Sequence, residues 1–318
     1  MIRKIIEILK NNKKFLITAH MNLEGDALGA QLAMYCLLKH LKKQAYICDN
    51  DPVPRAYSFL PHVKKIRTEV PDIQFDAALV LDCSDSFRTG MIKNHLSRAR
   101  YIVNIDHHIS NTFFGDVNWV DPYSSSACEI VYRLCKKMGI MDRQIALCLY
   151  TGIFTDTGNF TYANTTKRVH KIASELIEYN ISPHKIDEHL HSFCDMKDLD
   201  LIGSIVKSLK VNSNGKIVWA VIQHWPEKEY DLTEIIFSIM RLLHDVEVFV
   251  LFKKVSAHRV RVNLRSRSRV DVNRVAKFFG GGGHKRASGA TVDGTLPVVE
   301  KQVISFIRRF TNGRGRKS

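Results

Sequence analysis

The segment "NIDHHIS", residues 104–110, follows the apolar run Tyr101–Val103 and brings one carboxylate and two imidazoles together. A short apolar run with β-branched residues predicts a strand, and ligands of open α/β sheets bind just past the carboxyl ends of strands. Asp106, His107 and His108 are therefore candidate site residues. Taken alone, the triplet is better explained by a turn-capping Asp beside two ordinary histidines, because clustered polar groups are not by themselves evidence of function.

Further polar clusters occupy comparable places along the chain. They are His20, Asn22, Glu24 and Asp26 after "KKFLIT", Asp82 and Asp85 after "AALVL", and Asp156 in "GIFTDTGNF". Imidazole and carboxylate ligands suit manganese and related ions better than zinc bound by thiolates. Two such cations roughly 3.5–4 Å apart can activate a water and neutralise phosphoryl charge. Asp82 could bridge them, whereas Asp26 alone is also explained as a helix cap.

The alternation of elements in the first half predicts how these clusters converge. Strand-like runs alternate with helical patterns such as the one that starts at Asp26, which indicates βαβ units and a mostly parallel sheet. We expect an α/β fold with a catalytic metal-binding domain over residues 1–185 and a helical connector over 186–210. A smaller α/β substrate-binding domain follows over 211–318, with the active-site cleft between the two domains.

Charge is divided unequally between the halves of the chain. Of the 318 residues, 201–318 hold 22 Lys and Arg against 9 Asp and Glu, a net of +13, whereas 1–200 have a net of +2. A basic domain beside a near-neutral one suggests a polyanionic partner, because phosphate neutralisation drives nucleic-acid binding. The alternative is a solvated basic surface, which we prefer for the final "GRGRKS".

Cysteine usage and hydropathy indicate the compartment. The seven cysteines are scattered without a CxxC pair, which favours reduced thiols over disulfides or a zinc ribbon. The opening "MIRKIIEILKNNKKFLITAH" has no uninterrupted apolar stretch of secretory length, and no segment of the sequence approaches a run of roughly 20 apolar residues. We therefore expect a cytoplasmic protein without membrane contact.

With these motifs in place, the chain resembles the DHH phosphoesterases. "DHH" stands at Asp106–His108, "AHMNLEGDALGA" matches the first motif, and "GGGGHKRASG", residues 280–289, is similar to the glycine-histidine motif of the DHH-associated domain. The resemblance covers essentially the whole chain. It is strongest to the compact bacterial type, which degrades very short RNAs and dephosphorylates 3′-phosphoadenosine 5′-phosphate.

The resemblance implies roles for individual residues. One cation would be held by His20, Glu24 and Asp82, and the other by Asp26, Asp82, His107 and Asp156. The catalytic set would be Asp82, Asp106, His107 and His108. The substrate would be bound by His108, Arg265, Ser266, Gly281, Gly282, Gly283 and His284. Mn²⁺ is the expected ion, with Mg²⁺ or Co²⁺ as alternatives.

Two features need separate interpretation. Glu24 stands where the family usually has Asp, so its carboxylate lies one methylene farther out, and Leu23 in place of Pro frees that loop. We expect function to be retained, although a weak or water-mediated first cation is an alternative.

The run of four glycines at 280–283 lets backbone N–H groups approach an anion. A glycine run on its own, however, is more often only a flexible turn.

The residue clusters predict a two-metal phosphohydrolase, and the resemblance implies that its substrates are short RNA or DNA oligonucleotides, linear dinucleotides and nucleotide bisphosphates. A different enzyme on the same scaffold is one alternative, either a processive single-strand exonuclease or a cyclic-dinucleotide phosphodiesterase. The other is a nucleic-acid binder with a degraded metal site, which Glu24 and the basic half would support. The sequence leaves open whether the protein forms a homodimer.

Overall fold

A computed structural model describes residues 1–191, 194–225 and 232–311 of the chain. Contacts between Cα atoms divide it into two compact units, Met1–Phe193 and Cys194–Ser318. The expected connector, 186–210, falls across this division, because it contains the end of α6 in the first unit and α7 in the second. No helix among the described residues is long and apolar enough to cross a membrane.

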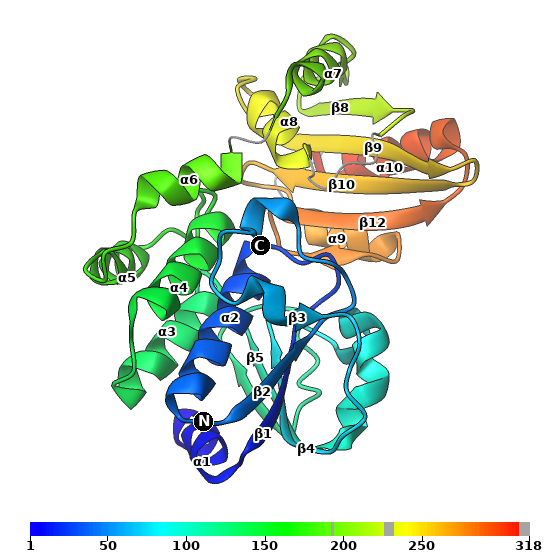
Figure 1. Ribbon diagram of the computed structural model, residues 1–318. Coiled ribbons are helices and arrows are strands. Elements are labelled where there is room, and N and C mark those ends of the chain that lie inside the picture. The colour runs from blue at the N-terminus through cyan, green and yellow to red at the C-terminus, as the bar shows by residue number, and fades with distance from the viewer. Residues whose placement is uncertain (192–193, 226–231, 312–318) are drawn as a thin grey trace, which may run out of the picture. The chain divides into compact units, whose positions relative to one another are not determined.

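The first unit is built on six parallel strands in the order β3-β2-β1-β4-β5-β6 (Figure 1). Its strands are β1 (Lys14–Thr18), β2 (Gln44–Cys48), β3 (Ile66–Arg67), β4 (Phe75–Leu81), β5 (Ala99–Asp106) and β6 (Val117–Val120). Its helices are α1 (Ile2–Asn11), α2 (Gly25–His40), α3 (Ala127–Met138), α4 (Arg143–Asp156), α5 (Lys167–Ile177) and α6 (Pro183–His191). Three 3₁₀ segments complete it: η1 (Arg55–Tyr57), η2 (Val63–Lys65) and η3 (Ser86–Arg98).

Both faces of this sheet are buried, as continuous apolar strands require. Leu79 and Leu81 of β4 face the core that contains α2, α3 and α4, whereas Ala78 and Val80 face a smaller core that includes Ile92 of η3. The period of two residues along a strand produces this division. Helix α2 is buried over residues 25–38 rather than along one stripe, because it packs against the sheet as well as α3 and α4.

The second unit carries a mixed sheet in the order β11-β12-β10-β9-β8-β7, in which only β8 and β9 are parallel neighbours among the described strands. Its strands are β7 (Lys210–Val211), β8 (Ile217–Ile222), β9 (Val248–Ser256), β10 (Arg259–Ser266), β11 (Gly282–Gly283) and β12 (Ala287–Asp293). Its helices are α7 (Met196–Lys207), α8 (Thr233–Met240), α9 (Val272–Phe278) and α10 (Leu296–Thr311). The expected α/β class is thus confirmed for both parts of the chain.

Candidate metal centre

The strand order of the first sheet creates a natural site. After β1 the chain moves to one side, to β2 and β3, and after returning to β4 it moves to the other side. The carboxyl ends of β1 and β4 therefore lie at the point where the order reverses, which is where ligands bind in open α/β sheets. His20 follows β1 by two residues, and Asp82 follows β4 directly.

Asp82 lies at the centre of the cluster and is held by its backbone. Its φ of 49° is left-handed, a conformation that Asp tolerates better than most residues. Its N–H donates to the carbonyl of Ile105 at 2.9 Å. Buried Asn104 of β5 donates from Nδ2 to the carbonyls of Val80 at 3.2 Å and Cys83 at 3.0 Å, on either side of Asp82. These bonds fix the turn that presents the carboxylate.

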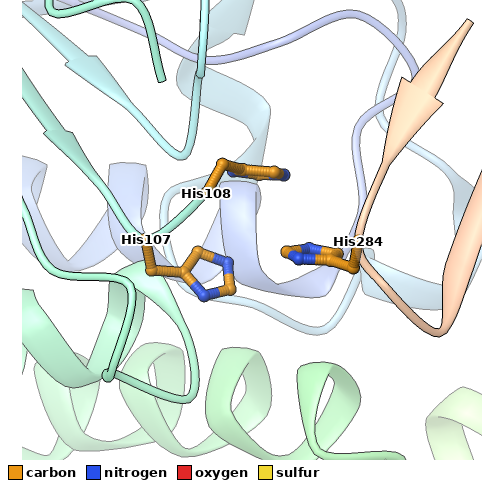
Figure 2. A group of neighbouring side chains, drawn as sticks. All are labelled: His107, His108 and His284. Atoms are coloured by element: carbon orange, nitrogen blue, oxygen red, sulfur yellow. The ribbon is translucent and has the colours of Figure 1, made fainter. Parts of the chain in front are cut away.

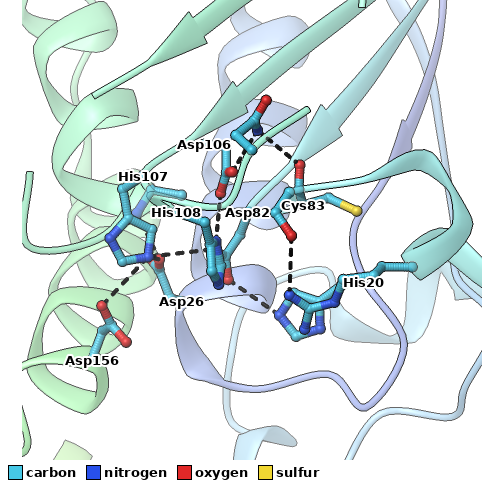
Figure 3. A network of polar contacts seen from close by, with 12 residues as sticks. His20, Asp26, Asp82, Cys83, Asp106, His107, His108 and Asp156 are labelled. Carbon is cyan, nitrogen blue, oxygen red and sulfur yellow. Dashed lines mark hydrogen bonds and ion pairs between the residues drawn. The ribbon is translucent and has the colours of Figure 1, made fainter. Parts of the chain in front are cut away.

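One group of potential ligands consists of His20, Glu24 and Asp82. Figure 3 labels His20 and Asp82 of this group. Nε2 of His20 lies 3.3 Å from Oδ2 of Asp82 and 3.7 Å from Oε1 of Glu24. Nδ1 of His20 lies 2.7 Å from the carbonyl of Met21, which can only accept, so Nε2 is the nitrogen that offers a lone pair. Glu24 is 58% exposed whereas His20 and Asp82 are buried. The longer side chain thus reaches the cluster from its solvent side.

A second group surrounds His107. Its Nε2 lies 3.4 Å from Oδ1 of Asp82 and 3.6 Å from both Oδ2 of Asp26 and Oδ2 of Asp156. Its Nδ1 faces the carbonyl of Ser124 at 3.4 Å. Although Asp26 lies in the first turn of α2, its carboxylate does not cap that helix. It accepts instead from the first N–H groups of α3, from Ala127 at 2.6 Å and Cys128 at 2.8 Å.

Asp106 and His108 form a third arrangement beside Asp82. Nδ1 of His108 lies 2.7 Å from Oδ1 of Asp106, while Asn111 donates to Oδ2 of Asp106 at 2.6 Å. The rings of His107 and His108 are 5.0 Å apart and inclined by 62°, so the two rings lie in different planes (Figure 2). Asp106 thus orients His108 through Nδ1, and Asn111 holds Asp106.

Burial and mutual charge govern protonation in the cluster. Burial and Asp82 raise the pKa of Asp26 to about 7, although His107 and the α3 N–H groups oppose them. Burial likewise raises the pKa of Asp156 well above its usual range, with Asp26 and Glu24 adding to it. Burial would lower the pKa of His20, but Asp82 outweighs it and raises the value to about 9. The carboxylates repel one another and are held together by protons or protonated imidazoles.

The donor set fits divalent cations. Among the described residues, Nε2 of His20 and Oδ1 of Asp82 are buried without a hydrogen-bond partner, although each lies near opposite charge. Asp156 also ends α4, where the helix dipole is unfavourable to an anion. A bound cation would give the buried atoms a partner and would offset the unfavourable helix dipole at Asp156. Mixed imidazole and carboxylate ligands suit manganese-like ions. Asp82 belongs to both groups and is therefore the candidate bridge.

Close helix packing brings Asp156 to the cluster. A Cβ on Gly25 would lie 2.2 Å from Oγ1 of Thr155, and one on Gly29 would lie 2.5 Å from the carbonyl of Cys148. Glycine at these two positions, one turn apart on α2, leaves room for the Thr155 side chain and lets the α4 backbone approach at Cys148. The glycines of "EGDALGA" are therefore needed for packing.

In the second unit, the expected substrate-binding residues lie on β10 and on or beside β11, and β12 lies between these two strands in the sheet. Arg265 of β10 pairs with Glu234, and Ser266 donates to the carbonyl of Val270 at 2.7 Å. His284 lies in the tight connection between β11 and β12. A Cβ on Gly281 would lie 2.1 Å from the carbonyl of Gly289. The glycine run is thus partly a hairpin strand that needs close backbone approach, rather than an entirely open loop.

Sequence reasoning missed the residues that support the cluster. Asn104, Asn111 and the carbonyl of Ser124 orient Asp82, Asp106 and His107 respectively. Asn104 and Asn111 lie within or next to "NIDHHIS", and polar residues at such positions were the available signal. Six of the seven cysteines are buried and carry free thiols.

Comparison with known proteins agrees with this geometry. Residues 14–153 match the DHH family N-terminal domain, and residues 214–312 match the DHHA1 domain. The chain is 32% identical over 310 residues to the bifunctional oligoribonuclease and PAP phosphatase NrnA of Thermus thermophilus, covering 96% of this chain and 93% of the relative. It is 30% identical to the probable bifunctional oligoribonuclease and PAP phosphatase NrnA of Streptococcus mutans, covering 91% of this chain and 92% of the relative.

A solved structure shows the same fold. The exopolyphosphatase-related protein of Bacteroides fragilis superposes with a TM-score of 0.88 at 24% identity, covering 98% of this chain and 97% of that one. The family domains and the near full-length relatives confirm the resemblance, and with it a divalent-metal-dependent class of phosphoesterase. The chain belongs to the DHH family.

Proposed function

We propose that this protein is a metal-dependent phosphohydrolase that releases mononucleotides from very short oligonucleotides and dephosphorylates 3′-phosphoadenosine 5′-phosphate. The names of the two relatives above support this substrate class. The observation that carries the proposal is Asp82, which belongs to both ligand groups, with His20 and Glu24 on one side and Asp26 and His107 on the other.

The proposed ligands are His20, Glu24 and Asp82 for one cation, and Asp26, Asp82, His107 and Asp156 for the other. When bound, two divalent cations supply an activated water nucleophile and neutralise charge on the phosphoryl group. Asp106 keeps Nδ1 of His108 engaged at 2.7 Å, so the other ring nitrogen is the one proposed to contact the scissile phosphate. Burial of Asp26, Asp82 and Asp106 strengthens electrostatic interactions at this edge.

We assign substrate binding to Arg265, Ser266, His284 and Gly281–Gly283 of the proposed DHH-associated domain, 211–318. Arg265 offers a planar guanidinium suited to phosphate, and its ion pair with Glu234 shows that it faces an anion. From the sequence we also propose that Mn²⁺ is the preferred ion, that the protein is cytoplasmic and that it forms a homodimer.

Side-by-side hydrolysis of three substrates tests the proposal. Purified protein with Mn²⁺ is offered a 5′-phosphorylated dinucleotide, a 24-mer and the adenosine bisphosphate. We expect turnover of the dinucleotide and the bisphosphate, little turnover of the 24-mer, and loss of activity in chelator. Preference for the 24-mer would indicate an exonuclease, and full activity in chelator would contradict the two-metal assignment.

A further inference from the structure

Two acidic side chains that follow β2 bind the backbone on either side of His20. Oδ1 of Asp49 accepts from the N–H of Ala19 at 3.0 Å, and Oδ2 of Asp51 accepts from the N–H of Asn22 at 2.6 Å. Neither acid belongs to a group of potential metal ligands among the described residues. Both nevertheless fix the short loop, residues 19–24, that carries His20 and Glu24.

Asp49 joins three elements at this point. Besides Ala19, its Oδ1 accepts from Oγ1 of Thr18 at the end of β1 and from Nε2 of Gln31 at 2.7 Å. Gln31 lies on α2, the helix that carries Asp26. The carboxylate thus sets the end of β1, and with it His20, against the helix that supplies the second cation's ligand.

Stability alone explains Asp49 poorly. Its side chain is 1% exposed, and among the described residues Oδ2 of Asp49 and Oε1 of Gln31 have no hydrogen-bond partner. Buried polar atoms without partners are costly, and apolar residues of similar size often stabilise such positions better. A role in holding the metal-binding loop accounts for the cost.

Asp51 acts at the part of the loop where this chain departs from its family. Asn22 has a left-handed φ of 61°, Leu23 does not restrain the backbone as Pro would, and Glu24 is largely exposed. Asn50 orients the Asp51 carboxylate by donating to Oδ1 at 2.8 Å. The bond to Asn22 therefore restrains the backbone two residues before Glu24.

We infer that Asp49 and Asp51 are positioning residues that hold loop 19–24 so that His20 and Glu24 reach one cation beside Asp82. The inference rests on the proposed function. Loss of supporting partners around a metal site typically costs about 10–100-fold in metal affinity. Because the bonds of both acids converge on this loop, the loss of metal affinity should fall on the cation proposed to be held by His20 and Glu24.

Titration of the metal-free protein with Mn²⁺ by calorimetry tests the inference. We expect Asp49→Ala and Asp51→Ala to weaken one Mn²⁺ site by roughly 10–100-fold and leave the other within about threefold. Asp49→Asn and Asp51→Asn, which keep an acceptor oxygen, should restore most of the affinity. The melting temperature of the metal-free variants reports folding separately.

Asp76 of β4 provides a matched control, because its carboxylate binds backbone N–H groups at the opposite end of β1. Its Oδ2 accepts from the N–H groups of Lys13 and Lys14 at 2.7 and 2.9 Å, at the amino end of β1. Asp76→Ala should change stability without changing either Mn²⁺ affinity. Unchanged Mn²⁺ affinity in folded Asp51→Ala would overturn the inference, even if Asp49→Ala did not fold. Failure of the unmodified protein to bind Mn²⁺ would contradict the proposed function itself.

Discussion

The edge of the first sheet and the arginine-bearing face of β10 both gather charged side chains, but they hold these side chains in different ways. At the sheet edge, Asp26, Asp82 and Asp106 are buried, and backbone or side-chain bonds fix each of them. On β10, Arg259, Arg261 and Arg265 alternate with buried Val260, Val262 and Leu264, so the arginines share the face away from the core.

The difference shows what each region can do. Buried carboxylates repel one another and need a cation, so their positions must be fixed before it binds. Arg259 instead pairs with Asp293, and both side chains are largely exposed, at 59% and 86%. Arg265, which is 18% exposed, pairs with Glu234, which is 52% exposed. Ion pairs in contact with solvent contribute little stability, so the partly exposed Glu234 can give way to another anion, such as a substrate phosphate. We therefore expect mutations to separate chemistry at the sheet edge from binding at β10.

Removing the shared carboxylate should have the largest effect. Asp82→Ala leaves both cations under-coordinated, and we expect kcat/KM on a dinucleotide to fall at least about a hundredfold, or ~2.7 kcal/mol. Steady-state kinetics and Mn²⁺ content measure the result. Asp85→Asn, which alters only the cap of η3, should keep near-normal activity because Asn caps as well as Asp. A variant that retains more than about a tenth of its activity would show that Asp82 is not the bridge.

Arg265→Ala should weaken substrate capture and spare the metals. A lost charge-assisted hydrogen bond is worth about 1.5–3 kcal/mol, so kcat/KM should drop roughly ten- to a hundredfold. Mn²⁺ binding should not change, because every proposed ligand lies in the first unit. Arg259→Ala removes a more exposed arginine from the same strand face and should have a small effect. Loss of Mn²⁺ binding together with activity would contradict the separation.

Gly29→Ala tests whether helix packing supports the sheet edge. The new Cβ would lie 2.5 Å from the carbonyl of Cys148 and 2.8 Å from Sγ of Cys128. Overpacking of this kind costs about 1–3 kcal/mol, which predicts a melting temperature lower by about 2–12 °C. Gly203→Ala on α7 meets nothing within 4 Å and should be neutral or stabilising. Calorimetric melting of both variants makes the comparison, and equal melting temperatures would mean that α4 can move away at no cost.

Much of the fold followed from the sequence because the strands are short, apolar and regularly separated by helices. The runs that contain β1, β4 and β5 could be recognised in this way, and the polar residues after them converge because the strands are parallel. The strand order was not available, since periodicity does not encode which strands are neighbours. The pairing of β1 with β4 places His20 beside Asp82. These strands lie far apart along the chain, so local sequence patterns could not predict that they are neighbours.

The supporting residues were hidden for a different reason. Asp49, Asn104 and Asn111 are ordinary polar residues in sequence, and only their burial and bonds reveal a role. Similarly, Asp26 was explicable as the cap of its own helix, whereas its carboxylate accepts from the N-terminus of α3, about 100 residues away. Glycine spacing in "GGGGHKRASG" did not reveal that part of the run pairs with β12.

Salt dependence should give the smallest effect and separates few phosphate contacts from many. For single strands, log K falls with log salt at about 0.7 per neutralised phosphate. A 5′-phosphorylated dinucleotide offers two phosphates, so raising salt from 50 to 200 mM should weaken binding by about sevenfold or less. A long-strand binder with six or more contacts would lose at least a few hundredfold over the same range. If Arg265 contacts one of the two phosphates, Arg265→Ala should lower the slope by about 0.7, whereas Arg259→Ala should leave it unchanged. Dissociation constants for a non-hydrolysable dinucleotide, measured across this salt range, check both values. A steep slope in the unmodified protein would mean that the arginine face follows an extended strand rather than the end of a short one.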